Sequence, residues 1–146
     1  IAVAAVAEPW AFAITEKGGQ IPGGNRVELA LGAFIGAITF TGKSGTQYPF
    51  HIWSLDTQFK PIGGVYFITQ RSIDKAKQLR PRHNAIFIGQ TEDLAQSFNA
   101  ATLPERFMKL GANCICVHLH DDPERRLGIE RDLLSVYSTD CNDQRY

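Results

Sequence analysis

The clearest hydrophobic pattern in the chain is a strict alternation near residue 115. Ile115, Val117 and Leu119 fall on one face of an extended segment. The residues around and between them fall on the other face: Cys114, Cys116, His118 and His120. Because successive side chains of a β-strand point to opposite faces, this alternation predicts a strand over 113–120.

Four further segments are predicted to form strands. Residues 64–69 and 85–89 are nearly continuous apolar runs, as in strands buried on both faces, and we expect the first to be central. Residues 38–41 and 48–55 flank a glycine-containing turn and predict a hairpin. Pro49 indicates an edge position or the beginning of its strand, because proline donates no hydrogen bond to a neighbouring strand.

Helices are predicted where a capping residue precedes apolar positions at helical spacing. Asp122 followed by Pro123 is such a start, and so is Thr91 with two acidic residues directly after it. The expected helices cover 26–34, 72–79, 91–99, 104–110 and 122–137. From residue 38 onward the order is β-β-β-α-β-α-α-β-α, which indicates an α+β fold: a small mixed β-sheet flanked by helices.

The first 37 residues differ in composition from the rest of the chain. They are rich in alanine and are interrupted by glycine and proline near residues 18–24. Residues 1–14 fit a strand or a short buried helix, and periodicity does not decide between them. We therefore expect an N-terminal extension, residues 1–37, and a domain, residues 38–146. Two interpretations of the extension stay open: it packs on the domain, or it mediates self-association or contact with a protein partner.

Composition is typical of a soluble, one-domain globular protein. The chain has 146 residues, of which 44% are hydrophobic and 21% charged. Three cysteines, a small and odd number, argue against a disulfide framework and favour a cytoplasmic location. No uninterrupted apolar stretch reaches the ~20 residues that a membrane-spanning helix needs, so we expect no membrane partner.

The formal net charge is zero, from 15 basic and 15 acidic residues. Phosphate contacts supply much of the affinity of nucleic-acid-binding proteins, so a net charge of zero weighs against nucleic-acid binding. A local basic group nevertheless occurs over residues 71–83. It consists of Arg71, Lys75, Lys77, Arg80, Arg82 and His83. A nucleic-acid contact and an ordinary solvated helix face are both consistent with this group.

Three short blocks carry the strongest functional signal. They are Gly64-Val65-Tyr66-Phe67-Ile68, the run IFIGQTEDL over 86–94, and the helix-like run RLGIERDLLSVY over 126–137. Their order and spacing resemble the GIY-YIG nuclease domain over about residues 38–142. The resemblance implies cleavage of a phosphodiester bond in nucleic acid with one divalent metal ion, Mg²⁺ or Mn²⁺, held by a helix carboxylate. In that family, tyrosines and an arginine surround the scissile phosphate.

The resemblance assigns roles to individual residues. The catalytic positions would be Tyr66, Phe87, Arg126 and Glu130, with the metal at Glu130. The substrate contacts would be Gly89, Asn142 and a basic rim of Arg71, Arg80 and Arg82. An oxygen ligand suits a hard cation such as Mg²⁺, and one carboxylate suffices if water and phosphate complete the coordination shell.

Three chemical groups of that family are missing from this chain. Phe87 stands where the family has a second tyrosine, so a hydroxyl is lost. Ser97 stands eight positions after Gly89, where the family usually has an arginine, and residues 98–101 contain no histidine. Losing one charge-stabilising group typically costs several kcal/mol of barrier. We therefore expect reduced or lost nuclease activity, unless Arg106 or Arg126 substitutes for the missing arginine.

Each residue also has a structural interpretation. Tyr66 would be a half-buried strand tyrosine, Gly89 would serve a tight turn, and Asn142 would brace the C-terminal loop. Glu130 and Arg126 would form an exposed pair one helical turn apart. The protein would then be a non-catalytic interaction or assembly subunit, or a domain that binds a small molecule in the same cleft.

The alternating face of 113–120 also raises the question of zinc, because cysteine and histidine are its usual ligands. Alternate residues of one strand are spread along it, so Cys114, Cys116, His118 and His120 are poorly arranged for one tetrahedral ion. We therefore favour cysteines that face the core as small apolar side chains.

Overall fold

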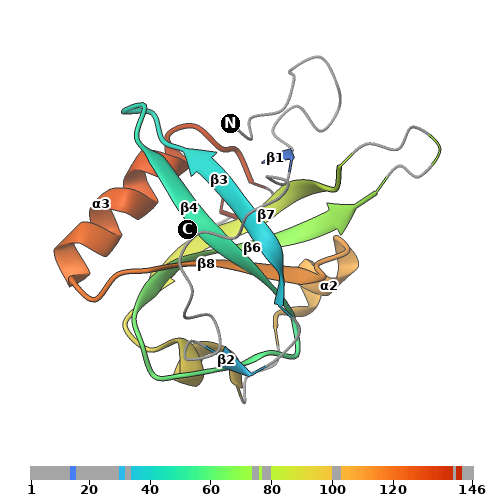
Figure 1. Cartoon of the computed structure of the whole chain (residues 1–146), viewed down its shortest axis with the longest axis horizontal. Helices are drawn as coiled ribbons and strands as arrows, with labels where there is room; N and C mark the ends of the chain where they lie inside the picture. Colours follow the sequence, from blue (N-terminus) through green and yellow to red (C-terminus); the bar gives the residue numbers. More distant parts are fainter. Residues whose placement is uncertain are drawn as a thin grey trace.

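The computed structural model describes residues 14–15, 30–31, 34–73, 76, 80–99, 103–139 and 141–142. Within these ranges the chain is a mixed α+β fold built on antiparallel strands (Figure 1). The strands are β1 (Ile14–Thr15), β2 (Ala30–Leu31), β3 (Phe34–Thr41), β4 (Gln47–Ser54), β5 (Gln58–Phe59), β6 (Gly64–Ser72), β7 (Arg82–Thr91) and β8 (Cys114–Leu119). The helical elements are the π-helical turn η1 (Ala95–Asn99), α2 (Glu105–Lys109) and α3 (Pro123–Leu134). None of these described helices is long and apolar enough to cross a bilayer.

The described strands form one large, strongly curled sheet and one small pair. The large sheet has the order β1-β7-β6-β8-β4-β3, and β2 pairs separately with β5. Its two edges approach each other, because Cα atoms of β1 lie within 8 Å of β3. The rings of Phe40 on β3 and Phe67 on β6 stack with centroids 3.8 Å apart, although β4 and β8 separate these strands in the sheet. The sheet therefore encloses a concave, aromatic core.

Each face of the curled sheet carries its own helical cover. Ile129 and Leu133 of α3 belong to the same buried cluster as Phe40 and Phe67, so α3 covers the concave face. A second cluster on the other face includes Phe107 of α2, so α2 covers that face. Figure 1 accordingly shows α3 and α2 on opposite sides of the sheet. β6 lies between β7 and β8, which confirms its predicted central position.

The sequence predicted the strands better than the short helices. All five predicted strands are present; β8 is one residue shorter at each end than predicted, and the others are longer or slightly shifted. Asp122 caps α3 by accepting a hydrogen bond from the Glu124 N–H. The alternation on β8 is confirmed, because Cys114 and Cys116 face one buried cluster and Ile115 and Val117 face the other.

Two predicted helices, over 26–34 and 91–99, differ from the structure in the residues that it describes. The helix expected over 26–34 is wrong at 30–31 and at Phe34, which are strand; its other residues lie outside the described ranges. Strand pairing overrides the local signal there, because β2 pairs with β5 and β3 with β4. The helix expected over 91–99 is reduced to η1, because Thr91 still belongs to β7.

Two other expectations concern segment boundaries. Ser72, expected to cap a helix over 72–79, is instead the end of β6, and most of that segment lies outside the described residues. The expected boundary at residue 37 falls inside β3, so the described sheet begins before the domain limit drawn from composition. Pro49 pairs with Thr39 of β3 and lies outside the part of β4 that pairs with β8.

Two asparagine side chains fasten loops to strand backbones in the same way. Asn142 accepts a hydrogen bond from the Ile88 N–H (2.8 Å) and donates one to the Ile88 carbonyl (3.0 Å). Asn113 makes the same two bonds with Arg71, at 2.7 and 3.1 Å. Asn142 is buried, 6% exposed, whereas Asn113 is exposed. Asn142 thus braces the C-terminal segment against β7, as its structural interpretation proposed.

Asn142 and Asn113 make the same two hydrogen bonds at a buried and an exposed position, so they allow a matched test of stability. We expect Asn142→Ala to lower the free energy of unfolding by about 1–3 kcal/mol, because it leaves buried backbone groups of Ile88 without partners. Asn113→Ala should cost less, because water replaces its bonds to Arg71. Urea unfolding of the two variants beside the wild type measures both values. Equal losses, or a larger loss in Asn113→Ala, would contradict the assignment of Asn142 as a buried brace.

Candidate functional site

The first element of the candidate site is the pairing of Tyr66 with Gly89. These two residues are direct cross-strand partners on β6 and β7. The tyrosine ring extends over the glycine, because a Cβ added at Gly89 would lie 2.6 Å from the Tyr66 hydroxyl oxygen and 2.8 Å from ring carbon Cζ. Gly89 is therefore required by the close approach of this side chain.

Aromatic rings surround the tyrosine. Phe98 of η1 meets Tyr66 edge to face, with ring centroids 4.9 Å apart, and Phe87 of β7 lies 6.1 Å away. Phe87 contacts Phe107 of α2 in turn, at 5.3 Å. Tyr66, Phe87 and Phe98 are only partly buried, so this group of rings reaches the molecular surface. The phenylalanine at position 87 keeps the packing role of an aromatic ring without its hydroxyl.

Glu130 contributes a negative charge to the site. Burial of Tyr66, together with the charge of Glu130, raises the pKa of the tyrosine to about 12. Tyr66 packs with the buried cluster on the α2 face of the sheet, whereas Glu130 belongs to α3, which covers the concave face. Near neutral pH the Tyr66 hydroxyl is protonated, so it can donate a hydrogen bond but is a poor base.

Arg126 is held inside the structure by named bonds. Its Nε donates to Gln90 Oε1 (3.0 Å) and its Nη1 donates to the His120 carbonyl (2.9 Å). The residue is 4% exposed. The interpretation of Arg126 and Glu130 as an exposed pair is therefore wrong for the arginine. Arg126 fastens α3 to β7 and to the end of β8, and it would have to break these bonds to reach a phosphate.

Ser97 is close to the site but carries no charge. Thr91 lies two residues after Gly89 on β7, and its hydroxyl is 2.8 Å from the Ser97 hydroxyl. Because side chains two residues apart share a face of a strand, Thr91 lies on the same face as Gly89 and Tyr66. Ser97 and Thr91 thus supply two hydroxyl groups, and no positive charge, on this side of the site.

The expected basic rim is not assembled around Tyr66. Ser72 pairs with Arg82 and Arg71 with His83 at one end of the β6–β7 hairpin, whereas Tyr66 pairs with Gly89 toward the other end. At about 3.3 Å per residue, Arg71 is roughly 17 Å along β6 from Tyr66. Arg80 precedes β7 and is at the same distant end.

The candidate site offers few protein ligands for a metal ion. Among the described residues, no group of three or more His, Cys, Asp or Glu side chains is placed to hold a metal ion. Glu130 supplies one carboxylate, which suits a hard cation whose remaining ligands are water and phosphate. Cys114 and Cys116 are buried in the core, and the His118 Nδ1 bonds to the Pro49 carbonyl, so these residues face different surroundings.

A second group of polar residues was not predicted from the sequence. Asp132 of α3 accepts hydrogen bonds from the Ser44 N–H (2.9 Å), the Ser44 hydroxyl (2.6 Å) and the Tyr48 hydroxyl (2.7 Å). Burial acts to raise the pKa of Asp132, but these hydrogen bonds outweigh it and hold the pKa below its usual value. No periodic pattern joins residues 88 positions apart, so only the folded structure shows this cluster.

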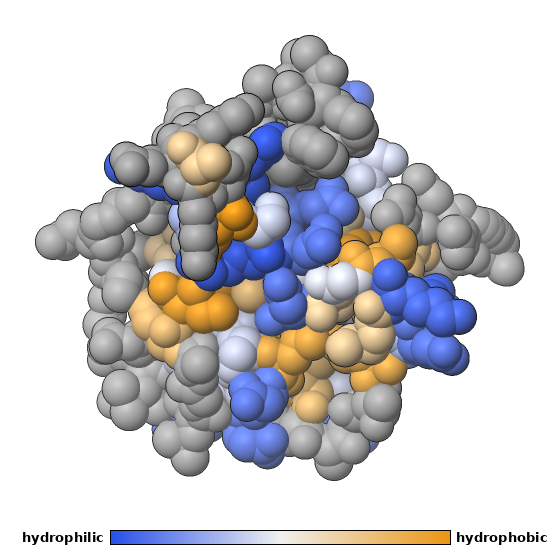
Figure 2. Space-filling model, turned by 90° about the vertical axis from the view of Figure 1, so that its right-hand side faces the viewer, coloured by the Kyte–Doolittle hydropathy of each residue, from blue (hydrophilic) through white to orange (hydrophobic). Residues whose placement is uncertain are grey.

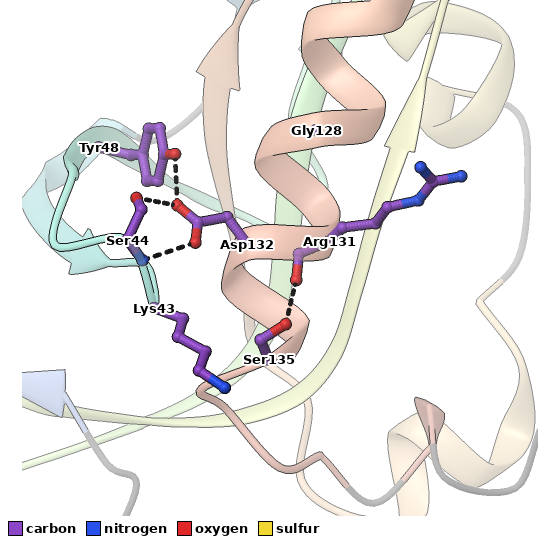
Figure 3. A pocket seen from close by; sticks show the side chains of 7 residues that line it. All are labelled: Lys43, Ser44, Tyr48, Gly128, Arg131, Asp132 and Ser135. Carbon is purple, nitrogen blue, oxygen red and sulfur yellow. Dashed lines mark hydrogen bonds between the residues drawn. The ribbon is translucent and has the colours of Figure 1, made fainter.

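Asp132 borders an open hollow of about 500 Å³ between the β3–β4 turn and α3 (Figure 3). Gly128 lies at this hollow, and the Arg131 side chain points away from Asp132 and Lys43. Both carboxylate oxygens of Asp132 are engaged by Ser44 and Tyr48. The cluster therefore ties the hairpin turn to α3, and its groups are directed toward one another.

Comparison with known proteins adds no identification. No protein-family model, curated protein or solved structure matches this chain. The functional argument therefore depends on the residues and contacts described above.

Two glycines give a sharp test of the Tyr66–Gly89 contact. We expect Gly89→Ala to lower the free energy of unfolding by about 1–3 kcal/mol, because the new methyl group would collide with Tyr66 and Phe87. Gly128→Ala on α3 meets no atom within 4 Å and should stabilise the helix by about 0.5–1 kcal/mol. Chemical denaturation measures both changes. A Gly89→Ala variant as stable as the wild type would contradict the close packing of Tyr66.

The raised pKa of Tyr66 predicts an alkaline titration. Since the folded pKa of about 12 exceeds the ordinary value of 10.0, the contribution of Tyr66 to stability is present below pH 10 and is lost as the pH rises toward 12. Glu130→Gln should lower the folded pKa only in part, because burial is the larger cause. The difference in phenolate absorbance between the wild type and Tyr66→Phe isolates this tyrosine. Titration near pH 10, or no change in Glu130→Gln, would disprove the arrangement.

Proposed function

We propose that this chain is a GIY-YIG-like domain that acts on nucleic acid and whose metal-dependent phosphodiesterase activity is reduced or lost. The observation that carries the proposal is the Tyr66 hydroxyl, packed over Gly89 and influenced by the charge of Glu130. Tyr66 and Gly89 belong to the two strand motifs in which the chain resembles the family, and the charge of Glu130 acts on Tyr66 from α3.

Glu130 is the residue that would hold Mg²⁺ or Mn²⁺. A bound divalent cation would supply Lewis-acid stabilisation of phosphate charge. Tyr66, protonated near neutral pH, would donate a hydrogen bond to a phosphate oxygen. Arg126 acts through α3, because its bonds to Gln90 and the His120 carbonyl position the helix turn that carries Glu130.

The same surroundings favour low activity. Phosphoryl transfer depends mainly on positioning and on cations that stabilise the charge of the transition state. At this site Ser97 bonds to Thr91, and Arg126 is buried. A protonated tyrosine with a pKa of about 12 is also a weak base. Several kcal/mol of charge stabilisation are therefore absent.

A non-catalytic assembly subunit is the alternative, and the described surface gives it less support. Large exposed apolar residues of the described chain occur at the end of β6, at the end of α2, at the end of β8 and on α3: Ile73, Met108, Leu110, Leu119 and Leu127. Figure 2, which views the right-hand side of Figure 1, shows described hydrophobic residues in several groups with hydrophilic residues between them. A partner-binding face is usually a larger continuous patch.

The proposal predicts weak or absent cleavage together with binding. We expect the wild type to bind mixed DNA and RNA oligonucleotides in filter-binding assays. We expect it to cleave them slowly or not at all with Mg²⁺ or Mn²⁺, because charge-stabilising groups are missing. Any residual cleavage should vanish in Glu130→Ala and fall in Tyr66→Phe, while Gly128→Ala, on the same helix, retains it.

Two results would contradict this proposal. Rapid cleavage that persists in Glu130→Ala would place the active centre elsewhere. Failure to bind any of the DNA or RNA substrates would exclude a nucleic-acid function and favour the assembly subunit.

A further inference from the structure

A basic residue of α2 lies beside the aromatic rings of the candidate site. The guanidinium carbon of Arg106 is 5.3 Å from the ring centroid of Phe107. Phe107 contacts Phe87, and Phe87 neighbours Tyr66, at the ring distances given above. Three successive contacts therefore connect the Arg106 guanidinium to Tyr66 on one face of the sheet.

Arg106 differs from the other arginines considered for this site in both place and exposure. Arg126 is 4% exposed and bonded to Gln90 and His120, whereas Arg106 is exposed. Arg71 and Arg82 lie at the far end of the β6–β7 hairpin. An exposed guanidinium over a buried ring keeps its hydrogen-bond donors available to a phosphate.

The partly exposed rings beside Arg106 suit a particular ligand. Proteins that bind single-stranded nucleic acid combine aromatic side chains, on which bases stack, with cations that contact the backbone. Tyr66, Phe87 and Phe98 provide rings that reach the surface, and Arg106 provides a cation next to them.

We infer that Arg106 binds a backbone phosphate of single-stranded nucleic acid whose bases stack on Tyr66, Phe87 and Phe98. This inference rests on the proposed function, since it names the strand-binding residues of the same site. Arg106 is a binding residue in this inference. It has no part in catalysis and does not substitute for the arginine that is missing at Ser97.

α2 offers a matched control for the charge of Arg106. Lys109 is also exposed and carries the same charge on the same helix, but its Nζ lies 3.6 Å from Glu105. Arg106→Ala and Lys109→Ala therefore change the net charge equally. Arg106→Lys keeps the charge and removes the planar set of donors that matches a phosphate.

The test is binding of fluorescein-labelled single-stranded DNA and RNA, followed by fluorescence anisotropy in EDTA, so that no cleavage occurs. We expect Arg106→Ala to weaken binding about tenfold, the effect of losing one charge-assisted hydrogen bond, and to reduce the salt slope by about 1. Lys109→Ala should bind nearly as the wild type does, and Arg106→Lys should fall between the wild type and Arg106→Ala.

Three outcomes would overturn the inference. If the wild type binds and Arg106→Ala binds equally well, the role of Arg106 in binding is rejected, while the proposed function is unaffected. Equal losses in Arg106→Ala and Lys109→Ala show a general charge effect. A wild type that binds neither strand rejects the proposed function and this inference together.

Discussion

The stacking of Phe40 on Phe67 is the contact on which the rest of the architecture depends. It joins β3 to β6 across the concave side of the sheet, at a centroid distance of 3.8 Å. Tyr137, which follows α3, adds edge contacts to both rings, and its hydroxyl accepts a hydrogen bond from the Thr41 N–H. The curl of the sheet and the path of the chain after α3 are therefore fixed by one aromatic cluster.

The position of the candidate site follows from this core. Because Phe67 points into the concave core, its neighbour Tyr66 must point to the other face of β6. Arg126 of α3 donates a hydrogen bond to Gln90, the residue next to Gly89 on β7. This bond fixes the position of the following helical turn, which carries Glu130. Two core-facing constraints thus set the tyrosine on one face of the sheet and the helix that carries Glu130 on the other.

The sequence predicted much of the sheet and less of the site. Apolar runs such as 64–69 identify strands because burial on both faces removes polar positions, and the central place of β6 was correctly expected. The local sequence favoured a helix over 26–34, but β2 pairs with β5 and β3 pairs with β4 instead. The Asp132 cluster and the burial of Arg126 depend on contacts between distant segments, which no local pattern encodes.

The residues on which the proposed function rests differ in how much they say about function. Gly89 is needed for the packing of Tyr66, and Asn142 braces the edge of β7, so both would be required in a protein with no activity at all. The Tyr66 hydroxyl is different, because a phenylalanine ring would serve the contacts with Phe87 and Phe98 equally well. Burial and the charge of Glu130 both disfavour the phenolate, so they keep the Tyr66 hydroxyl protonated as a hydrogen-bond donor. The Tyr66 hydroxyl is therefore the part of the candidate site that ring packing alone does not explain.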